Sequence, residues 1–362
     1  MPPQLSLLLL LFVLSSPLLA QEPTVKSIDD YQGLPTRIAF GSCSKQFKPQ
    51  PILRKIVEKR PDLFIYLGDN IYADTYDMQV IRDKYDELGS KPEFQTLREK
   101  VTVLSTWDDH DYGANDAGKE YPRKAESREI FFDFWKVPQE SPRRKHPGIY
   151  GSHEFDQNGK RLQVILLDTR YFRDPLKRRD KKQPADSPWK NDYQPDPNPD
   201  KTLLGTEQWK WLEQQFRKPA DLRIVCSSIQ FGHEYNGWES WTNLPAEQQK
   251  MFDLIKTTKA NGVVFISGDV HWAEINKRQL DGLYPIYDVT ASGLTEDWHN
   301  VEPSKYRLGK AYRDNHFGMF EIDWKADVPA VTFNIIGLDG RTQLQHQVSI
   351  ESLTFTNSKA TP

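Results

Sequence analysis

Four short segments of the sequence place metal-binding side chains directly after runs of apolar residues. They read Gly-Ser-Cys at 41–43, Gly-Asp-Asn-Ile-Tyr at 68–72, Trp-Asp-Asp-His-Asp at 107–111 and Gly-Asp-Val-His at 268–271. Each segment alone also suits an ordinary turn. In an open α/β sheet, however, ligands bind beyond the carboxyl ends of the strands, where separate strand ends converge. The four segments together predict a metal site, because buried charges need partners that packing alone does not supply.

The residue types in these segments indicate which ions would bind. Asp69 follows a glycine that lets the backbone turn close to a metal, so we expect its carboxylate to bridge two ions. Tyr72 can reach the same metal, but only a strongly Lewis-acidic ion such as Fe³⁺ would ionise a phenol with a free pKa of about 10. Cys43, as a thiolate, suits the same ion. Asp269 and His271 are separated by one residue and would face one side of a regular strand.

The elements that must position these side chains alternate between buried strands and amphipathic helices. Apolar runs predict strands at 37–42, 63–67, 101–106, 162–167, 223–229 and 263–267. Helices are predicted at 51–59, 206–216 and 245–259. Further strands, without helices between them, are predicted at 284–290, 318–323, 330–336 and 345–355. A parallel-rich sheet followed by a β-rich tail predicts an α/β fold in which two sheets pack together with helices outside.

The N-terminus and the overall charge indicate the location and the partners. The first 20 residues lack charged side chains and contain an apolar run that ends in Leu-Leu-Ala. We therefore predict a signal peptide at 1–20, one mature domain at 21–362, secretion to the periplasm or the exterior, and no transmembrane segment in the mature chain. A membrane anchor is the alternative, although a spanning helix needs roughly 20 apolar residues. The 48 basic and 51 acidic residues form no basic stripe, which argues against a stable nucleic-acid partner.

The order and spacing of seven segments resemble the alkaline phosphatase D (PhoD-like) family of metallophosphatases, which is related to the purple acid phosphatases. The resemblance covers residues 36 to about 295. It implies a four-layer αββα sandwich of the calcineurin-like metallophosphoesterase type, with the site at the strand ends. The matching segments are Phe-Gly-Ser-Cys at 40–43, Leu-Gly-Asp-Asn-Ile-Tyr at 67–72, Thr-Trp-Asp-Asp-His-Asp-Tyr-Gly at 106–113, Asn-Asp-Ala-Gly at 115–118, Leu-Asp-Thr-Arg at 167–170, Ser-Ile-Gln at 228–230 and Gly-Asp-Val-His-Trp at 268–272.

The resemblance also implies a dinuclear metal centre. One ion would be Fe³⁺-like, and the second would be divalent, with Ca²⁺ favoured over Zn²⁺, Mn²⁺ or Mg²⁺. Asp69 would bridge the two ions, and Asp109 and Asp269 would complete the divalent site. The residues around the trivalent ion would be Cys43, Asp69, Tyr72 and His271.

The expected reaction is the hydrolysis of a phosphate ester, either a small molecule or a polymer. A hydroxide held between the two ions would attack phosphorus in line. His110 would protonate the leaving oxygen, and Asp111 or Asp108 would hold its ring in place. Among the remaining residues of the resemblance, Asn115 would reach the substrate or a divalent ion. Arg170 would contact phosphate, with a structural salt bridge as the alternative.

Two other functions and one other use of the cysteines remain open. The enzyme would act mainly on phosphodiesters, phospholipids among them, if the groove is open. A calcium-dependent module that binds a polymer is the rival from another class, but such a site has no use for thiolate or phenolate ligands. Cys43 and Cys226 are the only cysteines, and a disulfide between them is the alternative to metal binding by Cys43.

Overall fold

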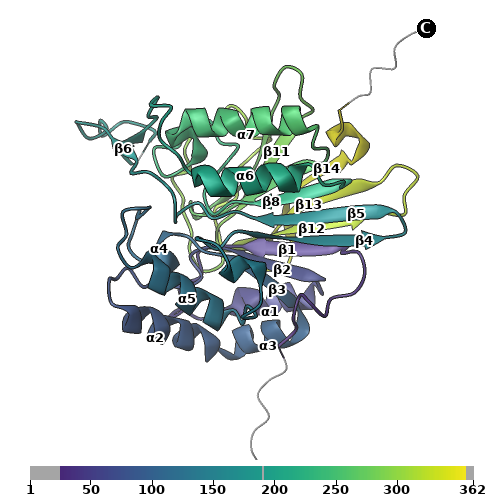
Figure 1. The fold of residues 1–362 in the computed structure, drawn as a ribbon, viewed down its shortest axis with the longest axis horizontal. Coiled ribbons are helices and arrows are strands. Elements are labelled where there is room, and N and C mark those ends of the chain that lie inside the picture. Colours follow the sequence, from purple (N-terminus) through teal and green to yellow (C-terminus); the bar gives the residue numbers. More distant parts are fainter. Residues whose placement is uncertain (1–24, 190, 356–362) are drawn as a thin grey trace, which may run out of the picture.

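A computed structural model describes residues 25–189 and 191–355. Two six-stranded sheets pack face to face, and helices cover the outer face of each sheet (Figure 1). The predicted α/β class and the four-layer αββα sandwich are therefore confirmed. The predicted signal peptide at 1–20 lies outside the described residues.

The first sheet has the strand order β14-β13-β12-β1-β2-β3. Strands β1, β2 and β3 run parallel, whereas β12, β13 and β14 form an antiparallel meander that joins at β1. The strands are β1 (Arg37–Gly41), β2 (Leu63–Leu67), β3 (Thr102–Thr106), β12 (His316–Asp323), β13 (Ala330–Gly337) and β14 (Thr342–Ser349). The helices on its side of the molecule are α1 (Pro51–Glu58), α2 (Met78–Gly89), α3 (Pro92–Lys100), α4 (Asp109–Tyr112) and α5 (Lys124–Phe134) (Figure 1).

The second sheet has the strand order β10-β11-β9-β8-β5-β4. Its four inner strands are parallel, and antiparallel β10 and β4 form the edges. The strands are β4 (Gly151–Gln157), β5 (Lys160–Leu166), β8 (Leu222–Cys226), β9 (Val263–Ser267), β10 (Ala273–Arg278) and β11 (Ile286–Ala291). Helices α6 (Gly205–Phe216) and α7 (Pro245–Thr258) cover its outer face (Figure 1). The remaining short elements are the hairpin β6 (Lys177–Arg178) and β7 (Tyr193–Gln194) and the 3₁₀ turns Pro142–Arg144, Trp241–Asn243 and Glu351–Leu353.

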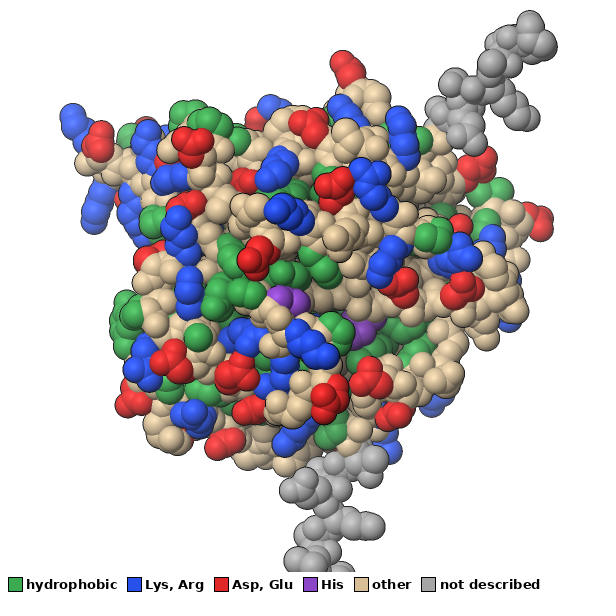
Figure 2. All heavy atoms as spheres, viewed as in Figure 1, with side chains coloured by type: hydrophobic (Ala, Val, Ile, Leu, Met, Phe, Trp, Pro, Cys, Tyr) green, Lys and Arg blue, Asp and Glu red, His purple; other side chains and the backbone are tan. Residues whose placement is uncertain are grey.

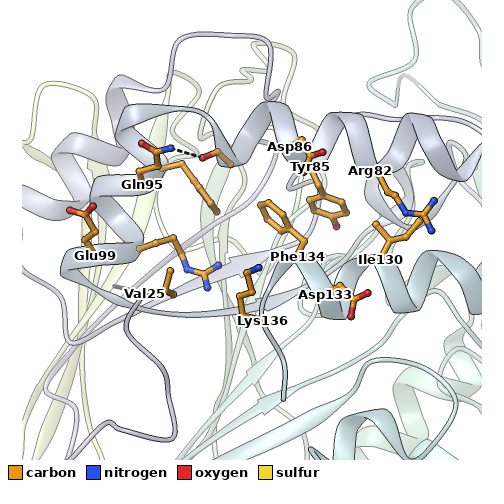
Figure 3. A pocket seen from close by; sticks show the side chains of 13 residues that line it. Val25, Arg82, Tyr85, Asp86, Gln95, Glu99, Ile130, Asp133, Phe134 and Lys136 are labelled. Carbon is orange, nitrogen blue, oxygen red and sulfur yellow. Dashed lines mark hydrogen bonds between the residues drawn. The ribbon is translucent and has the colours of Figure 1, made fainter. Parts of the chain in front are cut away.

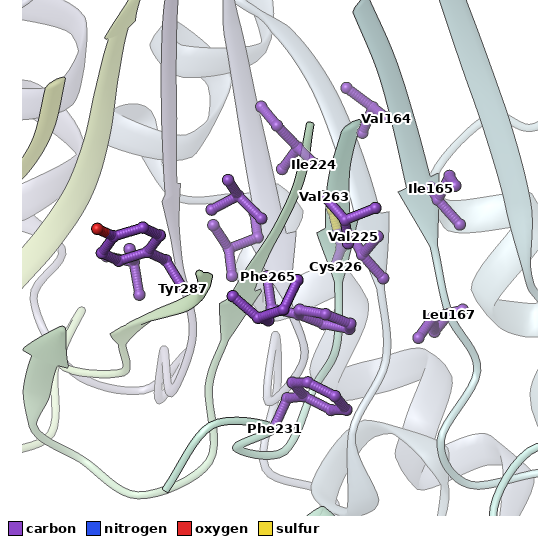
Figure 4. Close-up of a cluster of buried hydrophobic side chains, with 14 of the residues drawn as sticks. Val164, Ile165, Leu167, Ile224, Val225, Cys226, Phe231, Val263, Phe265 and Tyr287 are labelled. Carbon is purple, nitrogen blue, oxygen red and sulfur yellow. The ribbon is translucent and has the colours of Figure 1, made fainter. Parts of the chain in front are cut away.

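Alternation of side chains along the strands fills two separate cores. In β1, Ile38 and Phe40 face the core between the sheets, whereas Ala39 faces the core under α1 to α5. Both faces of the strand are buried, which explains why the sequence reads as a continuous apolar run. Figure 4 shows part of the larger core, where the rings of Phe231 and Phe265 stack with centroids 3.7 Å apart. Cys226 belongs to this core as a free thiol (Figure 4).

Several elements differ from the sequence prediction. Helices α2, α3 and α5 were not predicted, although α2 buries Met78, Ile81, Tyr85 and Leu88 on one face. The last strand ends at Ser349 rather than at residue 355, because the chain turns into the 3₁₀ segment Glu351–Leu353. The predicted disulfide alternative is wrong, since Cys43 and Cys226 are both free.

The carboxyl ends of the parallel strands of both sheets meet at one edge of the sandwich. The Thr106 hydroxyl at the end of β3 donates to the Leu167 carbonyl after β5, at 2.7 Å.

No helix within the described ranges is long and apolar enough to cross a membrane. On the face shown in Figure 2, Lys and Arg side chains are interspersed with Asp and Glu, without a continuous basic stripe.

Candidate metal centre

Donors from three separate strand ends meet at this edge. Ligand atoms of Cys43 after β1, Asp69 after β2 and His271 after β9 all lie within 4.8 Å of one another. The Cys43 sulfur lies 3.3 Å from Asp69 Oδ2. The Tyr72 hydroxyl lies 3.2 Å from the same carboxylate oxygen and 3.4 Å from His271 Nε2. The structure thus brings together the four residues expected around the trivalent ion.

The backbone at these positions is strained. Cys43, Asp69, Asp269 and His271 have φ values of 61°, 50°, 77° and 64°. Residues other than glycine adopt this left-handed region at a cost of about 1–3 kcal/mol each, and such residues concentrate at functional sites. The strand predicted at 263–267 matches β9, which ends at Ser267, so the condition of a regular strand at 269–271 is not met. Left-handed turns, rather than strand alternation, aim Asp269 and His271.

A second group of donors lies beside the first. Ligand atoms of Asp108, Asp109 and Asp269 come within 4.8 Å of one another, and so do those of Asp69, Asp109 and His110. Asp69 therefore belongs to both groups, as expected for a bridging carboxylate. Asp69 Oδ1, Asp108 Oδ2 and Asp109 Oδ1 are buried without a hydrogen-bond partner in the described part of the chain. Orphaned buried carboxylate oxygens fit cations, so the residues present suit a dinuclear metal group.

The electrostatics of these donors also favour bound cations. Burial, followed by the negative charge of Asp69, raises the pKa of the Cys43 thiol well above its ordinary value. Burial likewise raises the pKa of the Asp69 and Asp269 carboxyls and of the Tyr72 phenol. Groups that are desolvated and mutually repelling ionise together only when positive charge lies between them. A pair of metal cations supplies that charge.

His110 lies over this centre and is held by a carboxylate. Its Nδ1 is 2.7 Å and 2.9 Å from the two oxygens of Asp74, and its ring stacks on Tyr72 with centroids 4.1 Å apart. Burial lowers the pKa of the imidazole, but Asp109, Asp69 and Asp74 outweigh that effect and raise the pKa to about 11. The His110 side chain keeps 18% of its surface exposed, so a substrate can reach it.

Asp111 does not touch the His110 ring, and the prediction that it or Asp108 would hold that ring is wrong. Asp111 Oδ1 accepts the backbone N–H groups of Asp69 at 3.1 Å and Asp108 at 2.7 Å. Its Oδ2 accepts the Asn70 amide and, at 3.2 Å, the Tyr85 hydroxyl. Asp111 thus fixes the backbone that carries the metal donors, and Asp74 takes the predicted place beside the imidazole.

Arg170 lies in a buried ion-pair network, so the predicted phosphate contact is wrong and the salt-bridge alternative is right. Its side chain has no exposed surface. Its Nε donates to Asp108 Oδ1 at 2.5 Å, and its Nη1 lies 2.5 Å from Glu239 Oε2. The Asp109 carboxylate is 3.5 Å from its Nη2. Arg170 therefore compensates the negative charge beneath the metal donors.

Asn115 is exposed in the turn after α4, and no site contact involves its side chain in the described residues, so the structure gives no support for a substrate contact. Its neighbour Asp116 is the residue that reaches the site, because the Asp116 N–H donates to Asp109 Oδ2 at 2.8 Å. Asp109, Asp116 and Glu239 form a further group of three carboxylates within 4.8 Å. Three guanidinium groups face these carboxylates; they belong to Arg170, Arg173 and Arg178.

Cys43 and His271 are held by further contacts that were not predicted from the sequence. The Ser292 hydroxyl lies 3.1 Å from the Cys43 sulfur and accepts the His271 N–H at 2.9 Å. The Ser292 N–H donates to His316 Nε2 at 3.0 Å. The Ser-Gly pair at 292–293 gave the only hint of these contacts, since a glycine after a strand permits close approach.

The comparison with protein families agrees with this geometry. The model of the PhoD-like phosphatases matches residues 38–296. The chain belongs to the PhoD-like phosphatase family. It is 25% identical to alkaline phosphatase D of Bacillus subtilis over 276 residues, which are 65% of this chain and 46% of the relative. The chain thus matches less than half of that relative's length.

Solved structures share the fold. A structure of PhoD has 18% sequence identity and a TM-score of 0.64, with 88% of this chain and 72% of that chain covered. GAP50, the anchor in the inner membrane complex of Plasmodium, has 12% identity and a TM-score of 0.55, with 87% and 89% covered. A dimetal phosphatase from Danio rerio has 11% identity and a TM-score of 0.51, with 89% and 100% covered. The arrangement of layers is therefore that of metallophosphoesterases.

Proposed function

We propose that this protein hydrolyses phosphate esters at a dinuclear metal centre. One observation carries the proposal: thiol, phenol, imidazole and carboxylate donors from separate strand ends converge, and three buried carboxylate oxygens there lack hydrogen-bond partners among the described residues. Two cations bound by these donors would activate water and neutralise the phosphoryl oxygens. Membership of a phosphatase family supports this reaction class.

The chemistry of the donors supports a proposal for the two ions. Cys43 and Tyr72 offer a thiolate and a phenolate, which suit a trivalent iron better than Ca²⁺ or Mg²⁺. Asp109 and Asp269 offer only oxygen to the second ion, and we propose Ca²⁺ there, with Zn²⁺, Mn²⁺ or Mg²⁺ as alternatives. The thiol and phenol in the donor set speak against the rival function of a calcium-dependent binding module.

His110 is the proton donor in the proposed reaction. Asp74 accepts the Nδ1 hydrogen and orients the ring, and Tyr72 supports its face. Asp74 is not among the proposed metal donors, and its contact with Nδ1 favours the protonated imidazole. The ring can then deliver its proton to the leaving oxygen of the ester. The backbone contacts of Asp111 keep the Asp69 donor in position during this step.

Lys45 is the proposed substrate contact in place of Arg170. Its ammonium lies 4.8 Å from the centroid of the Tyr72 ring, and its side chain is 27% exposed, so a substrate beside the metal donors can reach it. Glu296 holds Lys45 at 2.8 Å and Lys48 at 2.6 Å. These two lysines provide positive charge for a phosphate monoester or for the flanking phosphate of a diester.

We propose that the mature enzyme acts after secretion, following removal of residues 1–20.

A comparison of two substrates and two variants tests the proposal. The purified protein should release nitrophenol from nitrophenyl phosphate, and activity on the bis(nitrophenyl) ester measures the preference for diesters. Asp69→Asn should lose bound metal and turnover, since it removes the bridging carboxylate. Asp77→Asn is the matched control, because Asp77 caps α2, belongs to none of the donor groups, and Asn caps equally well. Full activity in Asp69→Asn would refute the proposed site.

A further inference from the structure

A pocket lies between α2, α3 and α5, on the face of the first sheet that carries these helices (Figure 3). Its volume is about 450 Å³, within the usual range for small-molecule sites. Tyr85, Phe94, Ile130 and Phe134 provide apolar walls, and the rings of Tyr85 and Phe134 stack with centroids 4.4 Å apart (Figure 3). None of the proposed metal donors lines this pocket.

Arg98 gives the pocket an unusual polar group. Its side chain lines the pocket, and the residue is only 7% exposed. No carboxylate pairs with its guanidinium in the described part of the chain, and its Nε is buried without a hydrogen-bond partner. The rings of Phe94 and Trp135 lie 5.9 Å and 5.3 Å from its central carbon, so they hold the group flat without neutralising it. Charges this deeply buried are normally paired, so the guanidinium offers a place for an anion that enters the pocket.

The charges around the pocket select the kind of anion. The pocket is lined by three cationic residues, Arg82, Arg98 and Lys136, and by the exposed carboxylates of Asp86, Glu99 and Asp133 at its rim. None of these carboxylates pairs with Arg98 in the described residues, and Asp133 pairs with Arg144 at 2.7 Å. A dianion such as phosphate would meet these rim carboxylates, whereas a monoanion needs only the one unpaired guanidinium. The planar fork of arginine matches the two oxygens of a carboxylate. The remaining walls are aromatic or aliphatic, so the ligand's body must be apolar.

We propose that this pocket binds a small carboxylic acid with an aromatic or aliphatic body, whose carboxylate pairs with Arg98. The site is separate from the proposed metal centre and serves recognition rather than hydrolysis. The chain itself offers one competing carboxylate, Glu22, which lies outside the described residues and three positions before Val25 at the pocket wall.

Titration calorimetry with 3-phenylpropionate tests the proposal, with 3-phenylpropan-1-ol as the uncharged control of the same shape. The acid should bind saturably with one site per chain, and the alcohol should bind at least about tenfold more weakly. Arg98→Met should abolish the preference for the acid. Arg82→Met, at the exposed end of the same pocket, should retain it.

Three results would overturn the proposal: equal binding of acid and alcohol, an unchanged preference in Arg98→Met, or no saturable binding of either compound. Binding of the acid to Glu22→Gln but not to the natural chain would also overturn it, because the chain's own carboxylate would then be the occupant. If Arg98→Met fails to fold, Arg98→Lys replaces it. That variant keeps the charge but loses the planar fork, and the acid should bind about tenfold more weakly to it while the alcohol is unaffected.

Discussion

Substitution of Gly68 by alanine tests how tightly the chain packs where β2 delivers Asp69 to the metal centre. Gly68 has φ +104°, which side chains rarely adopt. An added Cβ would lie 2.5 Å from Asp108 Cβ, 2.7 Å from Asp108 N and 2.9 Å from the carbonyl carbon of Trp107. Two of these three atoms belong to the backbone, so Trp107 and Asp108 cannot make room for the methyl group by a change of side-chain rotamer.

Two costs add in Gly68→Ala. The left-handed backbone costs about 1–2 kcal/mol for a residue with a Cβ, and the overlap with the neighbouring backbone costs about 1–3 kcal/mol. We therefore expect the free energy of unfolding to fall by about 2–5 kcal/mol. Gly282→Ala is the matched control, because its φ is +70° and nothing lies within 4 Å of its added Cβ. Only the first cost, about 1 kcal/mol, applies there.

Urea unfolding of both variants measures the difference, and metal content and ester hydrolysis report on the site. Gly68→Ala should also lose metal and activity, since Asp69 and Asp108 must separate to admit the methyl group. Equal stability losses in the two variants, with metal content intact in both, would refute the reasoning.

Three further predictions concern the proton donor, the buried network and pH. His110→Ala should retain metal but slow the hydrolysis of esters with poor leaving groups by about 10²–10³-fold, with little effect on nitrophenyl phosphate, and Asp74→Asn should act in the same direction but less strongly. Steady-state kinetics measures both substrate types, and an equal loss of rate on both would contradict the role of His110 as proton donor. Arg170→Met should lower the free energy of unfolding by about 3–5 kcal/mol because it leaves buried carboxylates unpaired. Arg161→Met, in an exposed pair with Asp156, should leave it nearly unchanged, and similar urea midpoints for the two variants would contradict the network. Burial lowers the pKa of His316 from 6.5 to about 4, so the unfolded chain binds the proton first and the free energy of unfolding falls by about 3 kcal/mol as the pH drops through this interval. Between pH 7 and pH 4.5, His316→Gln should therefore lose less stability than the natural chain, and an identical loss would count against a neutral buried imidazole.

The layers and the place of the site could be predicted because they depend on periodicity. Ile38, Ala39 and Phe40 read as one apolar run since both faces of β1 are buried. The ends of parallel strands share an edge, so Cys43 and His271, far apart in the sequence, could be expected to meet. The helix at Met78–Gly89 carried a comparable signal in its spaced apolar residues, and that signal was overlooked.

The finer contacts could not be predicted because they depend on loop conformation. The sequence gives no indication that Arg170 pairs with Glu239, which lies in a loop beyond another strand. Nor does it show that Asp74, rather than the adjacent Asp111, turns toward His110. Both contacts depend on left-handed or irregular backbone, which follows no period in the sequence.

Elemental analysis combined with a visible absorption spectrum of the purified protein tests the metal centre most directly. We predict two metal ions per chain, one of them iron, and an absorption band that weakens in Tyr72→Phe and in Cys43→Ser, because phenolate and thiolate bound to Fe³⁺ absorb visible light. A colourless protein without stoichiometric metal would contradict the proposal that these strand ends hold a pair of cations.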